Sequence, residues 1–244
     1  MSTVDDLRDL IACPRCDRPL ESAGVAWRCA GCRVDFAPVG DIPWLFAEPN
    51  AALGEWRGRL HFSLQRIERE RLELETALAA PELRPATRAR IEALQRATAD
   101  QAARLRSLLA PLEIERHSAP VEAYLALRTR LPPDQGLTTY YPNIHRDWCW
   151  GDAENDASFD LLEHALRAAA PGRALVLGAG AGRLAYDFHQ RTAASVTVAL
   201  DFNPLLALVA KRVSAGERVE LYEFPLAPRN PLEHAVLRTL AAPA

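Results

Sequence analysis

The sequence contains no apolar run that approaches the ~18–20 residues needed to cross a lipid bilayer. Its first ten residues, MSTVDDLRDL, carry acids and lack the apolar core of a secretory signal peptide. Basic residues are not in excess, since 29 Lys and Arg stand against 32 Asp and Glu, and the net charge of −3 argues against nucleic acid as the main partner. We therefore expect a cytoplasmic protein that makes no contact with a membrane.

Four of the five cysteines form two close pairs, Cys13 with Cys16 and Cys29 with Cys32, and twelve residues separate the pairs. In a reducing compartment two CxxC pairs are more often a metal site than two disulfides. Four thiolates satisfy the tetrahedral coordination of zinc and leave no position for a substrate, which predicts a structural metal. A redox disulfide and a coincidence of spacing are the alternatives, and the same thiolates would also accept iron.

The segment around these cysteines, IACPRCDRPL…WRCAGCRVDFAPVGDIPWLF, resembles the small zinc-ribbon proteins that act as activator subunits of tRNA and protein methyltransferases. The shared pattern is a CPxC knuckle, a second CxxC, and an aromatic–x–Pro strand that runs into a glycine turn, over about residues 7–48. The resemblance implies an interaction module with no chemistry of its own. The alternative is a metal that only stabilises a segment too short to build a core.

Apolar residues recur at three- and four-residue spacing in residues 53–80 and 86–112, which predicts two helices. Pro81 and Pro85 interrupt this pattern, so the helices should form an antiparallel hairpin. Arg and Glu interleave on its surface as solvated pairs, which favours a spacer or dimerisation arm over a nucleic-acid face. A third helix is expected at Val121–Arg130.

A glycine-rich turn follows an apolar strand in GRALVLGAGAG, residues 172–182, and RLAYDFHQR should continue as a helix. A second strand is expected at Ser195–Leu200 and a third at Arg218–Tyr222. Between them Asn203 and Pro204 should begin a helix, with Asn203 as its cap. Asp201 ends the second strand, where an acid is placed to hold the hydroxyls of a ribose. Residues Pro231–Leu240 are expected to form the helix that follows the third strand.

The glycines of this turn, Gly178, Gly180 and Gly182, give the pattern G-x-G-x-G. In the dinucleotide fingerprint G-x-G-x-x-G the third glycine would fall on Arg183, and this mismatch argues against NAD. The turn together with the later acid Asp201 favours S-adenosylmethionine as the cofactor. A Rossmann-like unit with an empty turn is the alternative.

Two separated motifs, NIHRDW at residues 143–148 and the turn VLGAGAGRLAYD, resemble the carnosine N-methyltransferase-like family over roughly residues 138–212. The resemblance implies that Arg146 contacts the methionine end of the cofactor and that the three glycines form the cofactor turn. Asn143 stands where the family usually has glutamine, and Asp201 where it usually has glutamate. A guanidinium can grip a carboxylate with two parallel hydrogen bonds, which agrees with this role for Arg146.

Three residues in or next to the first motif have other interpretations. Arg146 could pair with Asp147 or another surface acid instead of a ligand. His145 could touch a substrate, and Cys149 is expected to be a buried, unreactive thiol. No catalytic base can be assigned.

The sheet that this family implies has seven strands in the order 3-2-1-4-5-7-6, of which only the first three can be found in the sequence. The methyltransferase domain is therefore expected to be incomplete in this chain. Its first strand would leave an unpaired apolar edge along Ala174–Leu177, covered by the chain's own helices, by a second copy or by a separate chain.

The sequence thus predicts an α/β protein with a zinc-ribbon domain at 1–50, a helical arm at 51–135 and a Rossmann-like S-adenosylmethionine-binding half-domain at 136–244. The first hypothesis is a methyltransferase that modifies a nitrogen of a small molecule, such as a histidine-containing one. The second is a non-catalytic zinc-ribbon interaction or scaffold protein with a vestigial cofactor domain. A zinc-ribbon nucleic-acid adaptor is a third hypothesis, which the acidic charge balance opposes.

Overall fold

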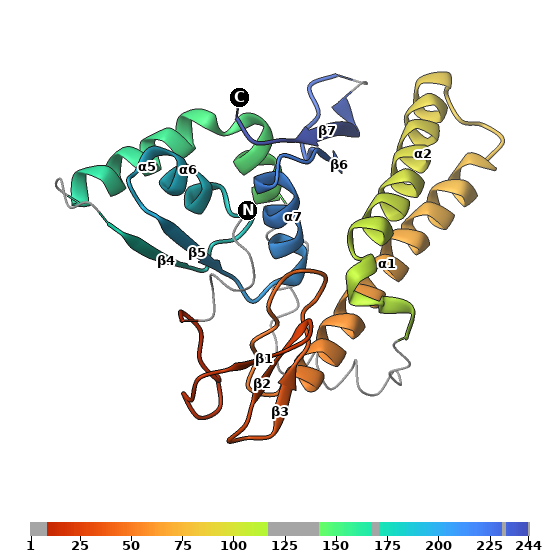
Figure 1. Cartoon of the computed structure of the whole chain (residues 1–244). Coiled ribbons are helices and arrows are strands. Elements are labelled where there is room, and N and C mark those ends of the chain that lie inside the picture. The colour runs from red at the N-terminus through yellow and green to blue at the C-terminus, as the bar shows by residue number, and fades with distance from the viewer. Residues whose placement is uncertain (1–8, 117–141, 167–170, 231–232, 244) are drawn as a thin grey trace.

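The protein, seen in a computed structural model, combines two long helices with three small sheets (Figure 1). The structure describes residues 9–116, 142–166, 171–230 and 233–243. The helix expected at Val121–Arg130 lies outside these ranges. In the described part of the chain, no helix is both long and apolar enough to cross a membrane.

The N-terminal segment forms an antiparallel sheet of three short strands, β1 (Glu21–Ala23), β2 (Ala26–Cys29) and β3 (Val34–Phe36). The register places Trp27 opposite Phe36. A small core of its own consists of Cys13, Leu20, Trp27, Cys29 and Phe36. A core of five side chains contributes little stability by itself.

Two helices, α1 (Pro49–Leu78) and α2 (Pro85–Leu108), form the predicted antiparallel hairpin (Figure 1). Each helix begins with a proline in its first turn, where a backbone N–H would have no hydrogen-bond partner within the helix, so its absence does not weaken the helix. The second helix ends earlier than predicted, and a separate 3₁₀ turn follows at Ala110–Leu112. Pro111 lies in that turn and lacks the amide that a continuing α-helix requires.

The C-terminal part contains the strand, turn, helix and strand that the glycine pattern predicts. Its elements are a π-helix (Arg146–Trp150), α5 (Asp152–Leu166), β4 (Arg173–Leu177), α6 (Arg183–Arg191), β5 (Val196–Leu200) and α7 (Pro204–Ser214). β4 and β5 pair in parallel, with Leu177 opposite Leu200. The side chain of Asn203 accepts a hydrogen bond from the Leu205 amide (3.0 Å) and thereby caps α7. α5 and α6 lie on one face of the two strands (Figure 1).

The prediction of a helix at Pro231–Leu240 is wrong. Val236–Leu240 is a strand, β7, which pairs antiparallel with β6 (Val219–Glu223). Exposed and less exposed residues alternate along β7 until Leu240, which is fully buried, and this two-residue period suits a strand. The third strand also does not extend the β4–β5 sheet, since within the described residues the only strand that β6 pairs with is β7. The Tyr222 amide of β6 donates instead to the side chain of Gln101 on α2 (2.8 Å). The fold is therefore mixed helix and sheet, and its paired strands do not form the continuous sheet of a Rossmann domain.

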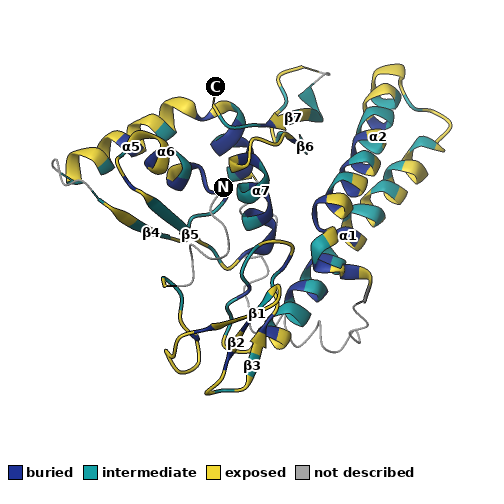
Figure 2. Ribbon diagram, viewed as in Figure 1, coloured by how far each residue is buried: buried dark blue, intermediate teal, exposed yellow. Residues whose placement is uncertain are grey.

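The largest hydrophobic core joins segments that are distant in sequence. Its members come from the end of the ribbon segment, the hairpin, the π-helix, α7 and the β6–β7 pair, and include Trp44, Trp56, Leu60, Leu108, Leu112, Trp148, Leu205, Val209, Leu221 and Leu240. Figure 2 shows buried stretches along α1, α2 and α7, and each of these helices contributes to this core. The three units predicted from the sequence are thus packed against one another through one shared core.

Candidate functional site

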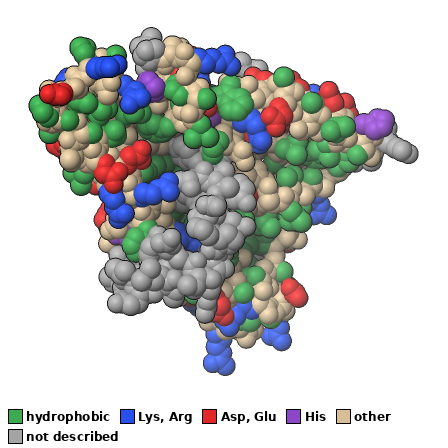
Figure 3. Space-filling model, turned by 180° about the vertical axis from the view of Figure 1, so that it is seen from behind, with side chains coloured by type: hydrophobic (Ala, Val, Ile, Leu, Met, Phe, Trp, Pro, Cys, Tyr) green, Lys and Arg blue, Asp and Glu red, His purple; other side chains and the backbone are tan. Residues whose placement is uncertain are grey.

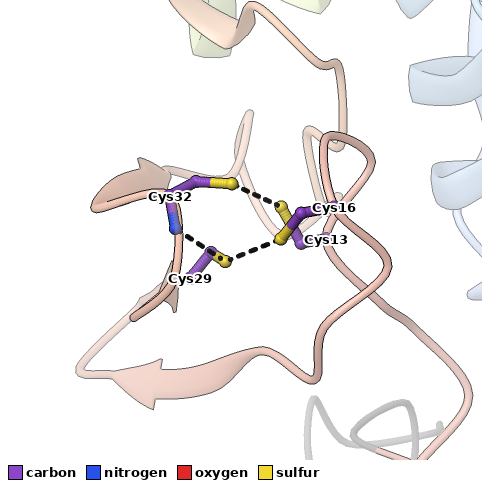
Figure 4. Close-up of side chains that lie close together, drawn as sticks. All are labelled: Cys13, Cys16, Cys29 and Cys32. Atoms are coloured by element: carbon purple, nitrogen blue, oxygen red, sulfur yellow. Dashed lines mark hydrogen bonds between the residues drawn. The ribbon is translucent and has the colours of Figure 1, made fainter.

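Four cysteine side chains converge between the ribbon knuckles (Figure 4). Cys13, Cys16, Cys29 and Cys32 place their sulfur atoms within 4.8 Å of one another. The Sγ–Sγ distance is 3.9 Å from Cys13 to Cys32 and 3.6 Å from Cys16 to Cys29. Four sulfurs at ~2.3 Å from a central zinc would be about 3.8 Å apart in a regular tetrahedron. The four thiols are therefore spaced to bind a metal ion such as zinc.

The same distances exclude disulfide bonds in this structure. A disulfide requires about 2.05 Å between sulfurs, and all four cysteines are free thiols. Two backbone amides donate to thiol sulfurs: the Arg15 amide to Cys13 Sγ and the Cys32 amide to Cys29 Sγ, each at 3.4 Å. For Cys13 burial outweighs this bond and raises the pKa of the thiol, and the hydrogen bond with Cys16 raises the pKa of Cys32. The bond from Cys32 lowers the pKa of the Cys29 thiol to about 7.

The glycine turn between β4 and α6 has the backbone shape that its sequence predicts. Gly178, Gly180 and Gly182 all have positive φ, at 62°, 59° and 88°. A Cβ added at Gly178 or Gly180 would meet no heavy atom within 4 Å, so open space lies beside the backbone there. At Gly182 an added Cβ would lie 2.7 Å from the Cβ of Ala210 on α7. Two glycines thus face open space, and the third allows two helices to approach closely.

Asp201 lies directly against this turn. Its Oδ2 accepts a hydrogen bond from the Gly180 amide (2.8 Å), and its Oδ1 accepts one from the Asn203 amide (2.8 Å). The carboxylate therefore joins the turn after β4 to the start of α7. A carboxylate has about four acceptor positions, so the two occupied by amides leave others for hydroxyl groups.

Arg146 is paired with acids in this structure, as the simpler interpretation proposed. Its Nε and Nη2 both donate to Asp147 Oδ1, at 3.0 and 2.7 Å, and its Nη1 lies 3.4 Å from Glu154 Oε1. Burial raises the pKa of Asp147, and the bond from Arg146 partly offsets that effect. Asn143 is half-buried and precedes Arg146 by three residues, at the start of the same helical stretch.

Two hydrogen bonds fasten the π-helix to the glycine turn. Trp148 Nε1 donates to the Ala181 carbonyl (2.8 Å), and Arg183 Nη1 donates to the Asp147 carbonyl (2.7 Å). Arg183 is buried, and its charge is balanced by Asp187 (2.8 Å) and Asp152 (3.0 Å). The sequence showed Arg183 only as a mismatch to a dinucleotide pattern, because the Asp147 carbonyl and Asp152 lie on other elements. The two motifs thus meet through backbone contacts, which fix the position of the helix that carries Arg146.

Cys149 and His145 lie close to the β6–β7 pair. Cys149 Sγ donates to the Thr239 carbonyl (3.1 Å), and burial raises the pKa of this thiol to about 11. A raised pKa favours the protonated thiol, which is a poor nucleophile, and Cys149 is half-buried where the sequence predicted a buried thiol. His145 is buried in the shared core region next to β6 and β7.

The burial of His145 predicts a pH dependence of stability. Burial lowers the pKa of His145, and nearby Glu223 and the Tyr222 backbone raise it by less. The unfolded chain protonates this histidine below about pH 6.5, and the folded protein does so only at a lower pH. The free energy of unfolding should therefore fall as the pH drops below that value. Urea titrations at about pH 7.5 and 5.5 should show a larger loss for the wild type than for His145→Gln, and equal losses would contradict the prediction.

Comparison of the chain with known proteins found no match among family models, curated proteins or solved structures. The functional conclusion therefore depends on the residues and distances described above.

Proposed function

We propose that the chain binds S-adenosylmethionine at the glycine turn and serves a methyltransferase that modifies a nitrogen of a small molecule. The observation that carries the proposal is the placement of Asp201 beside Gly180, in a strand–turn–helix–strand unit with open space at Gly178 and Gly180. A side chain at either glycine would fill the space that the ligand needs. The resemblance to the carnosine N-methyltransferase-like family supports the choice of cofactor.

In this proposal Asp201 and Arg146 bind different parts of the cofactor. When bound, S-adenosylmethionine supplies an electrophilic methyl group. Asp201 would accept hydrogen bonds from ribose hydroxyls with the acceptor positions that its backbone partners leave free. Arg146 would bind the carboxylate of the methionine part, which requires it to exchange Asp147 or Glu154 for the ligand. Transfer to an amine then depends mainly on the alignment of the nitrogen with the methyl group.

We propose zinc as the metal of the four-cysteine cluster, with a structural role. The four thiolates of the cluster would take all four positions of a tetrahedral zinc and leave none for water or substrate. The cluster lies in the ribbon core, with Cys13 and Cys29 fully buried. Its task is to hold the ribbon segment folded.

Titration calorimetry with S-adenosylhomocysteine tests the cofactor site. We expect binding by the wild type and none up to millimolar ligand for Gly180→Val, because a branched side chain would occupy the open space. Gly216→Val is the matched control, since Gly216 also has positive φ (86°) and open surroundings but lies after α7. It carries the same backbone strain and should still bind.

Asp201→Asn changes the shape of the acid least: its single side-chain oxygen can keep one of the two hydrogen bonds from the Gly180 and Asn203 amides, whereas alanine would release both. Loss of the charge should weaken binding roughly tenfold to hundredfold. If the wild type has no affinity for S-adenosylhomocysteine at millimolar concentration, the cofactor proposal fails. Binding of NAD would show instead that the choice of cofactor is wrong.

A second candidate function is a non-catalytic interaction protein. The observation that favours it is the pairing of β6 with β7 rather than with β5, which leaves β4 and β5 as a two-stranded sheet among the described residues. In this case the metal content and the fold would be intact while calorimetry detects no cofactor. The same titration therefore separates the two functions.

A further inference from the structure

Arg183 is a buried charge at an unfavourable position. It follows Gly182 directly and begins α6, and among the described residues it is the only arginine that is buried. Lys and Arg side chains are common on the surface of the molecule, as Figure 3 shows for one face. The first turn of a helix carries partial positive charge, so a cation there is destabilising, and burial also removes the hydration of the cation. The stability of α6 therefore gives no reason for an arginine at this position.

The guanidinium of Arg183 holds three elements together. Its Nε donates to both carboxylate oxygens of Asp187 on α6, at 3.0 and 2.8 Å, and this pair balances the charge within the helix. Its Nη1 donates to the Asp147 carbonyl of the π-helix (2.7 Å) and to Asp152 Oδ1 at the start of α5 (3.0 Å). The planar fork of an arginine can bind these partners at once, whereas the single ammonium of a lysine cannot.

The π-helix explains why the Asp147 carbonyl needs an outside donor. In an α-helix this carbonyl would accept from the amide of Gly151, four residues later. Here the Gly151 amide donates instead to the Arg146 carbonyl (2.8 Å), one residue earlier. The side chains of Arg183 (2.7 Å) and Asn155 (3.3 Å) donate to the Asp147 carbonyl in its place. Arg183 thus makes the shorter of the two bonds that replace the α-helical one.

A second hydrogen bond runs in the opposite direction between the same two segments. Trp148 Nε1 donates to the carbonyl of Ala181, two residues before Arg183 (2.8 Å). The Arg183 guanidinium lies 5.6 Å from the centroid of the Trp148 ring, and Tyr186 packs edge-on against that ring. Because each segment donates to a carbonyl of the other, both the distance and the rotation of the π-helix are fixed relative to the glycine turn.

We propose that Arg183 is a positioning residue of the cofactor site, which keeps residues 146–150 in the π-helical turn and so directs Arg146 toward a ligand at the glycine turn. The inference rests on the function proposed above. π-Helical turns are rare and are frequent at functional sites. A return to α-helical bonding would change the direction of Arg146, since successive residues of an α-helix are rotated by about 100°.

Hydrogen exchange followed by nuclear magnetic resonance tests the effect on the π-helical turn without any ligand. Arg183→Lys keeps the charge but loses the fork that reaches the Asp147 carbonyl. We expect the Gly151 amide and the Trp148 indole N–H to exchange at least about tenfold faster than in the wild type, because both take part in the contact that Arg183 supports.

Arg191→Lys is the matched control. Arg191 also lies on α6 and pairs with Asp156 (2.8 Å), but its partners among the described residues are on α5 and not on the π-helix. Both protons should exchange in this variant as they do in the wild type. If Arg183→Lys does not fold, Arg183→Met/Asp187→Asn removes the donor without leaving a buried charge unpaired, and it should show the same faster exchange.

Titration calorimetry with S-adenosylhomocysteine tests the consequence for the cofactor. Arg183→Lys should weaken binding at least about tenfold, and Arg191→Lys should leave it unchanged. A positioning residue acts through the group that it positions. In the background of Arg146→Gln, which itself should bind more weakly, the substitution of Arg183 should therefore have no further effect. A role in stability alone would weaken binding equally in both backgrounds.

Three results would contradict the inference, and they differ from a failure of the proposed function. Unchanged affinity of Arg183→Lys, or equal weakening in both backgrounds, would overturn the positioning role while cofactor binding by the wild type stands. Unchanged exchange of the Gly151 amide would show that the π-helical turn does not depend on Arg183. A wild type that binds no S-adenosylhomocysteine would overturn the proposed function and the role of Arg183 toward a cofactor together.

Discussion

Replacement of Cys29 by serine is expected to remove the metal from the chain and to unfold the ribbon. Cys29 is fully buried, its sulfur lies 3.6 Å from that of Cys16, and it belongs to the small ribbon core. Structural zinc supplies on the order of 10 kcal/mol to such units, far more than a core of five side chains can replace. Elemental analysis of protein purified without chelator should give one zinc per wild-type chain and none for the variant.

Cys149→Ser is the matched control for this experiment. Cys149 lies outside the cluster and donates to the Thr239 carbonyl, a bond that a serine hydroxyl can also make. This variant should keep its metal and its near-ultraviolet circular dichroism. A metal-free wild type with two intrachain disulfides would rule out the metal centre, and iron in place of zinc would correct only the identity of the ion.

The second large effect is expected at Gly182. Alanine there would carry a left-handed backbone conformation and would place its Cβ 2.7 Å from the Cβ of Ala210, which is fixed to the α7 backbone. The conformation costs about 1–2 kcal/mol and the overpacking another 1–3 kcal/mol. We expect urea unfolding to show a loss of roughly 2–5 kcal/mol, with α6 and α7 forced apart.

Gly178→Ala separates these two contributions. Gly178 also has positive φ, but an added Cβ there meets nothing within 4 Å. Its replacement should cost only about 1–2 kcal/mol, the conformational part of the effect. Equal losses at both positions would mean that α6 and α7 yield to the extra methyl group, and the close approach at Gly182 would then have no energetic importance.

The elements that the sequence located well are those with strong local signals. The glycine turn fixes the start of α6, and Asn203 with Pro204 fixes the start of α7, because a cap and a preset φ act within two or three residues. The CxxC spacing likewise brings two thiols together within each knuckle. Such features need no knowledge of the rest of the chain.

The errors arose where distant contacts decide the structure. A short apolar run such as Val236–Leu240 suits a helix or a strand, and its pairing with β6 selects the strand. Arg183 gave no local sign that it would bind the carbonyl of Asp147, 36 residues earlier. The separation of β6 from β5 follows from contacts with α2 through Gln101, a residue of the hairpin. The predicted cofactor roles of Asn143 and Arg146 stay predictions.

The burial of Trp44 limits how the ribbon could exchange partners. Its indole Nε1 donates to the Pro49 carbonyl (3.0 Å), and its ring belongs to the same core as Leu60 and Leu108 of the hairpin. A subunit that associates and dissociates during its working cycle must keep apolar surface available for its partner. Here that surface is already covered by the chain's own helices, so release of the ribbon would require the indole to enter water. Detachment would therefore be a slow unfolding event, and the ribbon would remain with the hairpin throughout any cycle of binding.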